Sequence, residues 1–166
     1  MSGEPRYKEQ LERLKRWYNR FSELNKGKIH DRESSYYIDE VHAFFPNCYH
    51  LKDWIKNDES LKLSEQEKQK VEDFISNNYH LSLCADICNS IKHLKLTSRP
   101  RSDKDPSLGN IKYKVRLGSE PTTIAVEVSI DTTDGPLDAY ELAKECIHAW
   151  EEFIKQWICG RNRTTR

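Results

Sequence analysis

Apolar side chains recur every three or four residues through most of this chain, and this spacing limits the fold more than any other feature of the sequence. The first set, from Tyr7 to Phe21, steps by four, three, four and three residues, and a second set from Tyr37 to Ile55 repeats the spacing. Residues at these intervals share one face of an α-helix, which must be buried against other elements. The sequence therefore predicts a mainly α-helical fold built from amphipathic helices.

A few residues indicate where these helices end or bend. Gly27 is expected to stop the first helix, and Pro46 lies inside the second, where the missing N–H predicts a kink or a short break. Ser64 and Glu67 have the spacing of a capping box, so a third helix should begin there. Asn77 and Asn78 predict a turn or bend, after which the stretch 79–96 is predicted to be the fourth helix.

After the fourth helix the composition changes. Residues 97–109 are rich in proline, serine and charge, which is typical of a loop. Two runs then alternate apolar and polar residues, IKYKVRL and TTIAVEVSI, with GSEP between them to turn the chain. We therefore predict a β-hairpin over residues 110–131, lying on the helices or on a partner because a lone hairpin is marginal in water.

The last part of the chain returns to helical spacing. We predict a final helix over residues 135–159, opened by Gly135 and Pro136 and ended by Gly160. The basic residues 160–166 are predicted to form a frayed tail.

The whole chain, residues 1–166, is predicted to form one domain: an antiparallel bundle of about five helices, four of them within residues 5–96, with the hairpin inserted before the last. Lysine and arginine together number 27, as do aspartate and glutamate, so the formal net charge is zero and no overall field attracts nucleic acid or a membrane. No run approaches the roughly 20 apolar residues of a membrane span, and the charged N-terminal residues predict no signal peptide. The five cysteines include no CxxC pair, so we expect free thiols in a reducing, cytoplasmic compartment.

The predicted fourth helix carries more reactive groups than a core helix needs. Asp86, Asn89 and His93 share one edge because they are three and four residues apart. On the second helix a polar stripe runs beside the apolar face: Asp39, His42, His50 and Asp53. If these helices pack side by side, the two edges can line one cleft suited to acid-base chemistry or to phosphate contacts. The alternative interpretation is the ordinary polar boundary of two amphipathic helices.

A zinc site is a further interpretation of the same stretch. His80, Cys84 and Cys88 are spaced by four residues, but the first and last lie about 12 Å apart along a helix that rises 1.5 Å per residue. One ion could not be reached from both ends, so further ligands would have to come from elsewhere, with Cys48 as one candidate. Cys84 and Cys88 also lie on the apolar face, where free cysteines are commonly buried. We therefore predict no metal ion and no cofactor.

The segment CNSIKH, residues 88–93, resembles the motif of the HEPN superfamily, in which an arginine and an asparagine precede a histidine (R-N-x-x-x-H). Asn89 and His93 match the last two positions, whereas Cys88 stands in place of the arginine. Members of that family are bundles of four or five helices, and many are metal-independent ribonucleases of defence, CRISPR and toxin–antitoxin systems. The resemblance implies an HEPN-like fold with Asn89 and His93 as catalytic residues. It also implies weakened cleavage, because cysteine offers neither the charge nor the forked donors of arginine.

Basic residues continue from the motif helix into the loop that follows it. The residues expected to contact a phosphate-bearing substrate are Lys92, Lys95, Arg99 and Arg101, together with Asp86 and His50. Cations near a helix C-terminus also interact favourably with the helix dipole, which is a sufficient explanation for the two lysines.

The leading functional hypothesis is a cytoplasmic HEPN-like protein of defence or toxin–antitoxin type that binds RNA or cleaves it weakly without a metal. The resemblance implies a homodimer, since family members commonly pair with their motifs facing each other. The alternative is a non-catalytic module for interaction or dimerisation, in which the edge of the hairpin binds a partner protein by strand addition. The lost arginine favours the second hypothesis, and the retained Asn89 and His93 favour the first.

Overall fold

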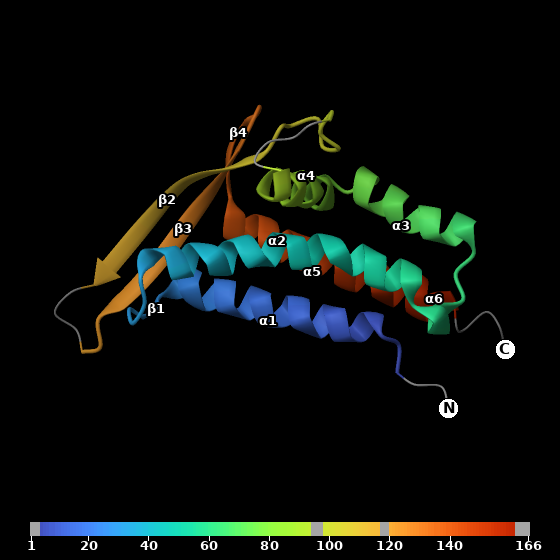
Figure 1. Ribbon diagram of the computed structural model, residues 1–166, viewed down its shortest axis with the longest axis horizontal. Coiled ribbons are helices and arrows are strands. Elements are labelled where there is room, and N and C mark those ends of the chain that lie inside the picture. Colours follow the sequence, from blue (N-terminus) through green and yellow to red (C-terminus); the bar gives the residue numbers. More distant parts are fainter. Residues whose placement is uncertain (1–3, 94–97, 117–119, 162–166) are drawn as a thin grey trace.

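Five principal helices and a small antiparallel sheet make up the computed structural model, in which residues 4–93, 98–116 and 120–161 are described (Figure 1). The helices are α1 (Tyr7–Lys26), α2 (Ser34–Asn57), α3 (Glu65–Asn77), α4 (Tyr79–His93) and α5 (Ala139–Phe153). Helices α1, α2 and α5 lie side by side, α3 and α4 pack next to them, and the sheet extends from one end (Figure 1). The prediction of a mainly helical fold with strands before the last helix is confirmed.

The apolar stripe predicted in the first helix is the buried face of α1. Tyr7, Leu14 and Phe21 are all at most 3 % exposed and belong to the core shared with α2 and α5. Gly27 ends the helix as expected: its φ of 114° is one that residues with a Cβ rarely adopt, and its N–H donates to the carbonyl of Glu23 at 2.9 Å.

Helix α2 continues through Pro46, so the short break offered by the sequence is absent. The neighbouring Asn47 forms one hydrogen bond within α2 and another to α1. Its Nδ2 donates to the carbonyl oxygen of Ala43 at 2.8 Å, and its own carbonyl accepts from Nε2 of Gln10 on α1 at 3.0 Å. The bond from Gln10 holds α1 against α2, and the bond to Ala43 adds a donor one residue from the His42 carbonyl, which Pro46 leaves without its usual N–H.

The third and fourth helices begin as the sequence indicates. Ser64 caps α3 and forms the predicted capping box with Glu67, in which each side chain bonds the other residue's backbone N–H. Asn78 separates α3 from α4, and its Oδ1 accepts from the N–H of Leu81 at 3.0 Å. Helix α4 is described as far as His93, and the rest of the predicted helix, residues 94–96, lies outside the described residues.

The sheet has four strands instead of the two that were predicted. They are β1 (Lys28–Ile29), β2 (Ser107–Arg116), β3 (Thr123–Thr132) and β4 (Gly135–Asp138). All pairing is antiparallel, and β3 is the central strand, with β2 on one side and both short strands on the other. The alternating residues of β3 that face α1 and α5 are buried: Ile124, Val126, Val128 and Ile130. The hairpin therefore lies on the bundle, as expected from its marginal stability alone.

The start of the last helix was predicted too early. Gly135 and Pro136 belong to β4, and α5 begins at Ala139 after Asp138, whose carboxylate accepts from the N–H of Glu141 at 2.8 Å. Pairing with β3 decides this, because Gly135–Asp138 satisfies backbone groups of the central strand.

The end of the last helix also differs from the prediction. Helix α5 passes into a π-helical turn, η2 (Ile154–Ile158), and then into α6 (Cys159–Arg161), so Gly160 lies within helix instead of ending it. The predicted tail beyond Arg161 lies outside the described residues. No helix in the described ranges is long and apolar enough to cross a membrane.

Candidate functional site

The polar edge predicted on α4 is present, but its residues have different surroundings. Asn89 is half-buried and His93 is exposed, so both are accessible near the end of the helix. Asp86, one turn earlier on the same edge, is only 2 % exposed. The motif residues and this carboxylate therefore do not share one solvent-filled site.

Asp86 binds the loop that leads to β2. Its Oδ1 accepts from the N–H of Arg101 at 2.8 Å, and its Oδ2 accepts from the N–H and the hydroxyl of Ser102 at 2.8 and 2.6 Å. Both oxygens are engaged, so Asp86 holds the loop against α4 and does not lie in an accessible substrate site.

Arg101 takes part in an ion-pair cluster between α2, α3 and the loop. Its Nη1 lies 3.2 Å from Oε2 of Glu72, whose Oε1 lies 3.1 Å from Nζ of Lys52 and also pairs with Lys56. Burial raises the pKa of Glu72, but hydrogen bonds and charge from Lys56 and Lys52 outweigh it and bring the pKa to about 2. The guanidinium of Arg101 is thus neutralised by a carboxylate.

The remaining basic residues predicted for substrate contact have mixed environments. Arg99 pairs with Asp103 at 2.8 Å, and its side chain is 81 % exposed. Lys92 is exposed at the end of α4. His50 on α2 is exposed, and its Nδ1 lies 3.2 Å from Oδ2 of Asp53. Lys95 lies outside the described residues.

Cys88, at the position of the motif arginine, is buried with 5 % exposure. Burial and, to a smaller extent, Cys48 raise the pKa of its thiol to about 11, against the opposing charges of Lys92 and Lys52. Helices α2 and α4 pack against each other, and Lys52 and Asp53 on α2 are close enough to act on the Cys88 thiol. Cys88 is therefore a neutral, buried thiol at physiological pH.

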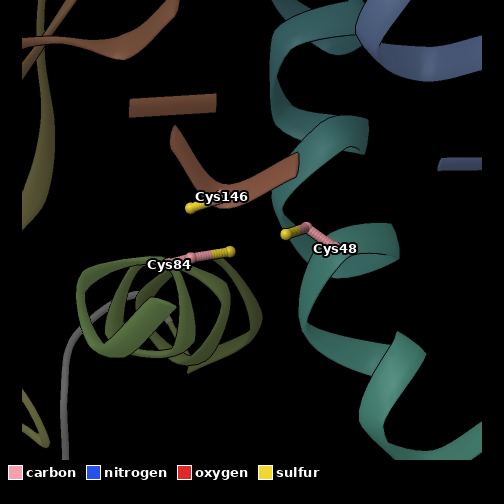
Figure 2. A group of neighbouring side chains, drawn as sticks. All are labelled: Cys48, Cys84 and Cys146. Atoms are coloured by element: carbon pink, nitrogen blue, oxygen red, sulfur yellow. The ribbon is translucent and has the colours of Figure 1, made fainter. Parts of the chain in front are cut away.

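A second cluster consists of three cysteines from three helices, which we call the cysteine triad: Cys48 on α2, Cys84 on α4 and Cys146 on α5. Figure 2 shows their side chains directed into the space between the helices, and the three Sγ atoms lie within 4.8 Å of one another. All three are at most 1 % exposed. They are the only group of three or more histidine, cysteine or acidic residues with metal-ligand spacing in the part of the chain that the structure describes.

The hydrogen bonds of the triad differ between its members. Cys84 donates to the carbonyl oxygen of Phe45 at 3.6 Å, and Cys146 donates to that of His80 at 3.4 Å. Burial raises the pKa of Cys48, but the thiols of Cys146 and Cys84 and the nearby indole of Trp150 outweigh it and lower that pKa. A thiol has one proton, so the carbonyl and the Cys48 sulfur compete for each of the two donors.

The sequence places Cys84 and Cys146 on apolar helix faces and offers Cys48 as a candidate ligand, but it does not indicate Cys146 as a ligand. The structure groups these three instead of the set on one helix, His80, Cys84 and Cys88. The only signal in the sequence is a cysteine within the apolar stripe of each of three helices. That pattern is equally typical of buried cysteines that serve as small apolar residues.

A third feature is the outer strand of the sheet, β2. It pairs with β3 along one side, and its other side has no strand partner in the described part of the chain. Every residue from Lys112 to Arg116 is exposed, including Tyr113 at 38 % and Val115 at 42 %. This edge therefore presents unpaired backbone groups together with apolar side chains.

No protein-family model, no curated protein and no solved structure matches this chain. The HEPN resemblance thus remains a prediction based on the segment CNSIKH.

Proposed function

We propose that this protein is an interaction module that binds an extended segment of a partner protein along the free edge of β2. The observation that carries this proposal is the ten-residue strand Ser107–Arg116, exposed from Lys112 onward and unpaired on its outer side among the described residues. A segment added there would complete backbone hydrogen bonds that water otherwise satisfies, which is the basis of strand addition.

The side chains of β2 indicate the chemistry of the partner. Tyr113 and Val115 lie opposite the buried Val126 and Ile124, so they continue the core face of the sheet beyond the cover of the helices. The opposite face of β2 carries cations at alternate positions, Lys112, Lys114 and Arg116. An added strand that alternates apolar with acidic residues would match both faces.

The same pattern disfavours pairing of β2 with β2 of a second copy. In an antiparallel pair centred on Lys114, Lys112 would lie opposite Arg116 of the other chain, and like charges at directly opposed positions are destabilising. The partner that this edge fits is therefore a different, acidic segment.

A reducing, cytoplasmic compartment is consistent with the free thiols of the described cysteines.

The test uses two synthetic peptides, one alternating valine with glutamate and one alternating valine with lysine. We expect the glutamate peptide to bind and to slow hydrogen exchange of β2 amides. Reversing Lys112 and Arg116 together, K112E and R116E, should weaken binding by about tenfold, from two cross-strand pairs of roughly 0.7 kcal/mol each. Lys144→Glu on α5 is the matched control and should leave affinity unchanged. Equal binding of both peptides, or protection away from β2, would reject the proposal.

A second candidate function is RNA binding with weak, metal-independent cleavage. It is favoured by the accessibility of Asn89 and His93 at the end of α4, together with the exposed cation of Lys92. In this function His93 would take part in proton transfer at the ribose 2′-hydroxyl, and two chains would pair with their α4 ends facing each other. The buried Cys88 supplies no charge for the scissile phosphate, so cleavage is slow.

Cleavage of single-stranded RNA, followed in EDTA, tests this second function. Activity of the wild type that persists in EDTA and disappears in His93→Ala is the expected result. His148→Ala, at an exposed histidine on α5, is the control and should retain activity. Cleavage abolished by EDTA, or unchanged in His93→Ala, would exclude this chemistry, and light scattering would test the dimer.

A further inference from the structure

The cysteine triad lies in the core, away from the β2 edge, and no part of the proposed function uses it. Cys48, Cys84 and Cys146 are separated by 36 and 62 residues along the chain, yet their sulfurs point into one space between α2, α4 and α5 (Figure 2). Each comes from a different helix, so the spacing of the sulfurs is set by the packing of three rigid elements.

We propose that the triad is a binding site for a single soft, thiophilic ion that takes three sulfur ligands, with trivalent arsenic and the cuprous ion as its two candidate occupants. The distances suit this. Three sulfurs with bonds of about 2.3 Å to one ion stand about 4 Å apart when the ion lies in their plane, and about 3.4 Å apart around pyramidal trivalent arsenic. The observed separations are at most 4.8 Å, so the sulfurs need to approach one another by less than about 1 Å around a planar ion and by at most about 1.4 Å around arsenic.

The number of donors selects the kind of ion. Zinc in structural sites and iron–sulfur clusters take four protein ligands, and among the described residues no further cysteine, histidine or carboxylate joins the three sulfurs. Soft thiolate donors without oxygen or nitrogen partners favour soft ions that accept low coordination. The triad thus favours ions that bind three sulfur ligands over ions that need a fourth protein ligand.

A polar group beside the triad supports its role as a site. The indole Nε1 of Trp150 is fully buried and lacks a hydrogen-bond partner of good geometry in the described structure. It lies near the Cys48 sulfur. A buried donor without an acceptor costs free energy, and a Cys48 sulfur that has lost its proton on binding an ion can accept this N–H.

Charge distinguishes the two candidate ions. The surrounding core is apolar, so an uncompensated charge there is costly. Arsenous acid, As(OH)3, reacts with three thiols to form As(S-Cys)3 and three waters: three As–O bonds break, three As–S bonds form, and the thiol protons leave in the water. No electrons are transferred and both sides are neutral. The cuprous ion with three thiolates would leave two negative charges, so arsenic is favoured.

Native mass spectrometry of the full-length protein with arsenite, in the absence of oxygen, tests the site. We expect one arsenic per chain with the loss of three hydrogen atoms, a rise in Tm, and partial quenching of tryptophan fluorescence from Trp150. Substitution of any triad cysteine by alanine should weaken binding by more than about 100-fold, beyond the effect usual for residues that only support a ligand. Cys88→Ala, on the same helix as Cys84, is the matched control and should bind arsenite as the wild type does.

X-ray absorption on the wild-type complex keeps the test decisive if a triad variant fails to fold. Three sulfur neighbours at one distance support the site, and fewer than three overturn it. A parallel titration with Cu(I) separates the two candidates: binding of both ions or of arsenite alone supports the proposal, and binding of neither overturns it. Zinc that competes effectively with arsenite would also overturn it, because the triad lacks the fourth protein ligand of structural zinc sites.

Discussion

The hydroxyl of Ser102 and the carboxylate of Asp86 lie 2.6 Å apart, and the N–H of Ser102 donates to the same oxygen at 2.8 Å. With the N–H of Arg101 on the other oxygen, one buried carboxylate serves three donors of the loop. This loop leads directly into β2, so a helix residue first considered for substrate binding fixes the entry of the chain into the sheet.

Asp86→Ala should therefore destabilise the protein by about 2–4 kcal/mol, because two backbone N–H groups lose their acceptors in a largely buried setting. Asp86→Asn should cost less, since its amide retains one acceptor oxygen. Urea unfolding measures both. Asp73→Ala, at an exposed position of α3, should change stability by less than about 0.5 kcal/mol. A loss for Asp86→Ala no larger than that of the control would contradict the role given to Asp86.

Glu72 predicts how stability depends on pH. Its pKa is about 2 in the folded protein and about 4.5 ordinarily, so its ionised form stabilises the fold above the ordinary pKa, and this contribution disappears as pH falls from about 5 to 2. Its side chain is 22 % exposed, so solvent screens the ion pairs. We therefore expect ionised Glu72 to contribute about 1–2 kcal/mol to the free energy of unfolding.

Glu72→Gln should accordingly lose this contribution at pH 7 and match the wild type near pH 2, as measured by urea unfolding across the range. Glu65→Gln removes a pair with Lys68 whose glutamate is 87 % exposed, and it should have little effect at any pH. A difference between Glu72→Gln and the wild type that is the same at pH 7 and pH 2 would show that charge is not the cause.

The thiols should differ sharply in reactivity. In the native protein at pH 7.5, iodoacetamide should modify the exposed Cys159 within minutes and leave the other four cysteines unmodified. Burial protects the triad, and the raised pKa of Cys88 adds to its protection. Peptide mass spectrometry after labelling gives the modified sites, with urea-unfolded protein as the control in which all five react. Rapid labelling of any triad cysteine would contradict the packing described here.

The variant Cys88→Arg tests whether position 88 can accommodate the arginine of the HEPN motif. A guanidinium there would enter a buried position near Lys92 and Lys52, so we expect a loss of about 2–4 kcal/mol in urea unfolding. Cys88→Ser is the control for the loss of the thiol. A stable Cys88→Arg variant that cleaves RNA faster than the wild type would instead favour the second candidate function.

Local features of the fold followed from the sequence because they depend on neighbours in the chain. The structure confirms three features that involve only residues close together in the sequence: the apolar stripe from Tyr7 to Phe21, the end of α1 at Gly27, and the capping box of Ser64 and Glu67. The buried face of β3 also follows the alternation read from the sequence, since Ile124, Val126, Val128 and Ile130 all lie on the side packed against the helices.

The candidate sites depended on which segments meet, and helical spacing does not contain that information. Asp86 lies on the edge predicted for it, but only the path of the loop back across α4 gives its carboxylate three donors. Gly135 and Pro136 have the composition of a helix start, yet pairing with β3 makes them a strand.

The cysteine triad shows the same division most clearly. The sequence by itself determined that Cys48, Cys84 and Cys146 lie on the buried faces of three helices, because burial follows from periodicity along each helix. Only the tertiary structure decided that their sulfurs lie within 4.8 Å of one another. The rotation and offset with which α2, α4 and α5 pack are fixed by contacts throughout the core, and a change of one residue in that offset would move a sulfur by 1.5 Å along its helix.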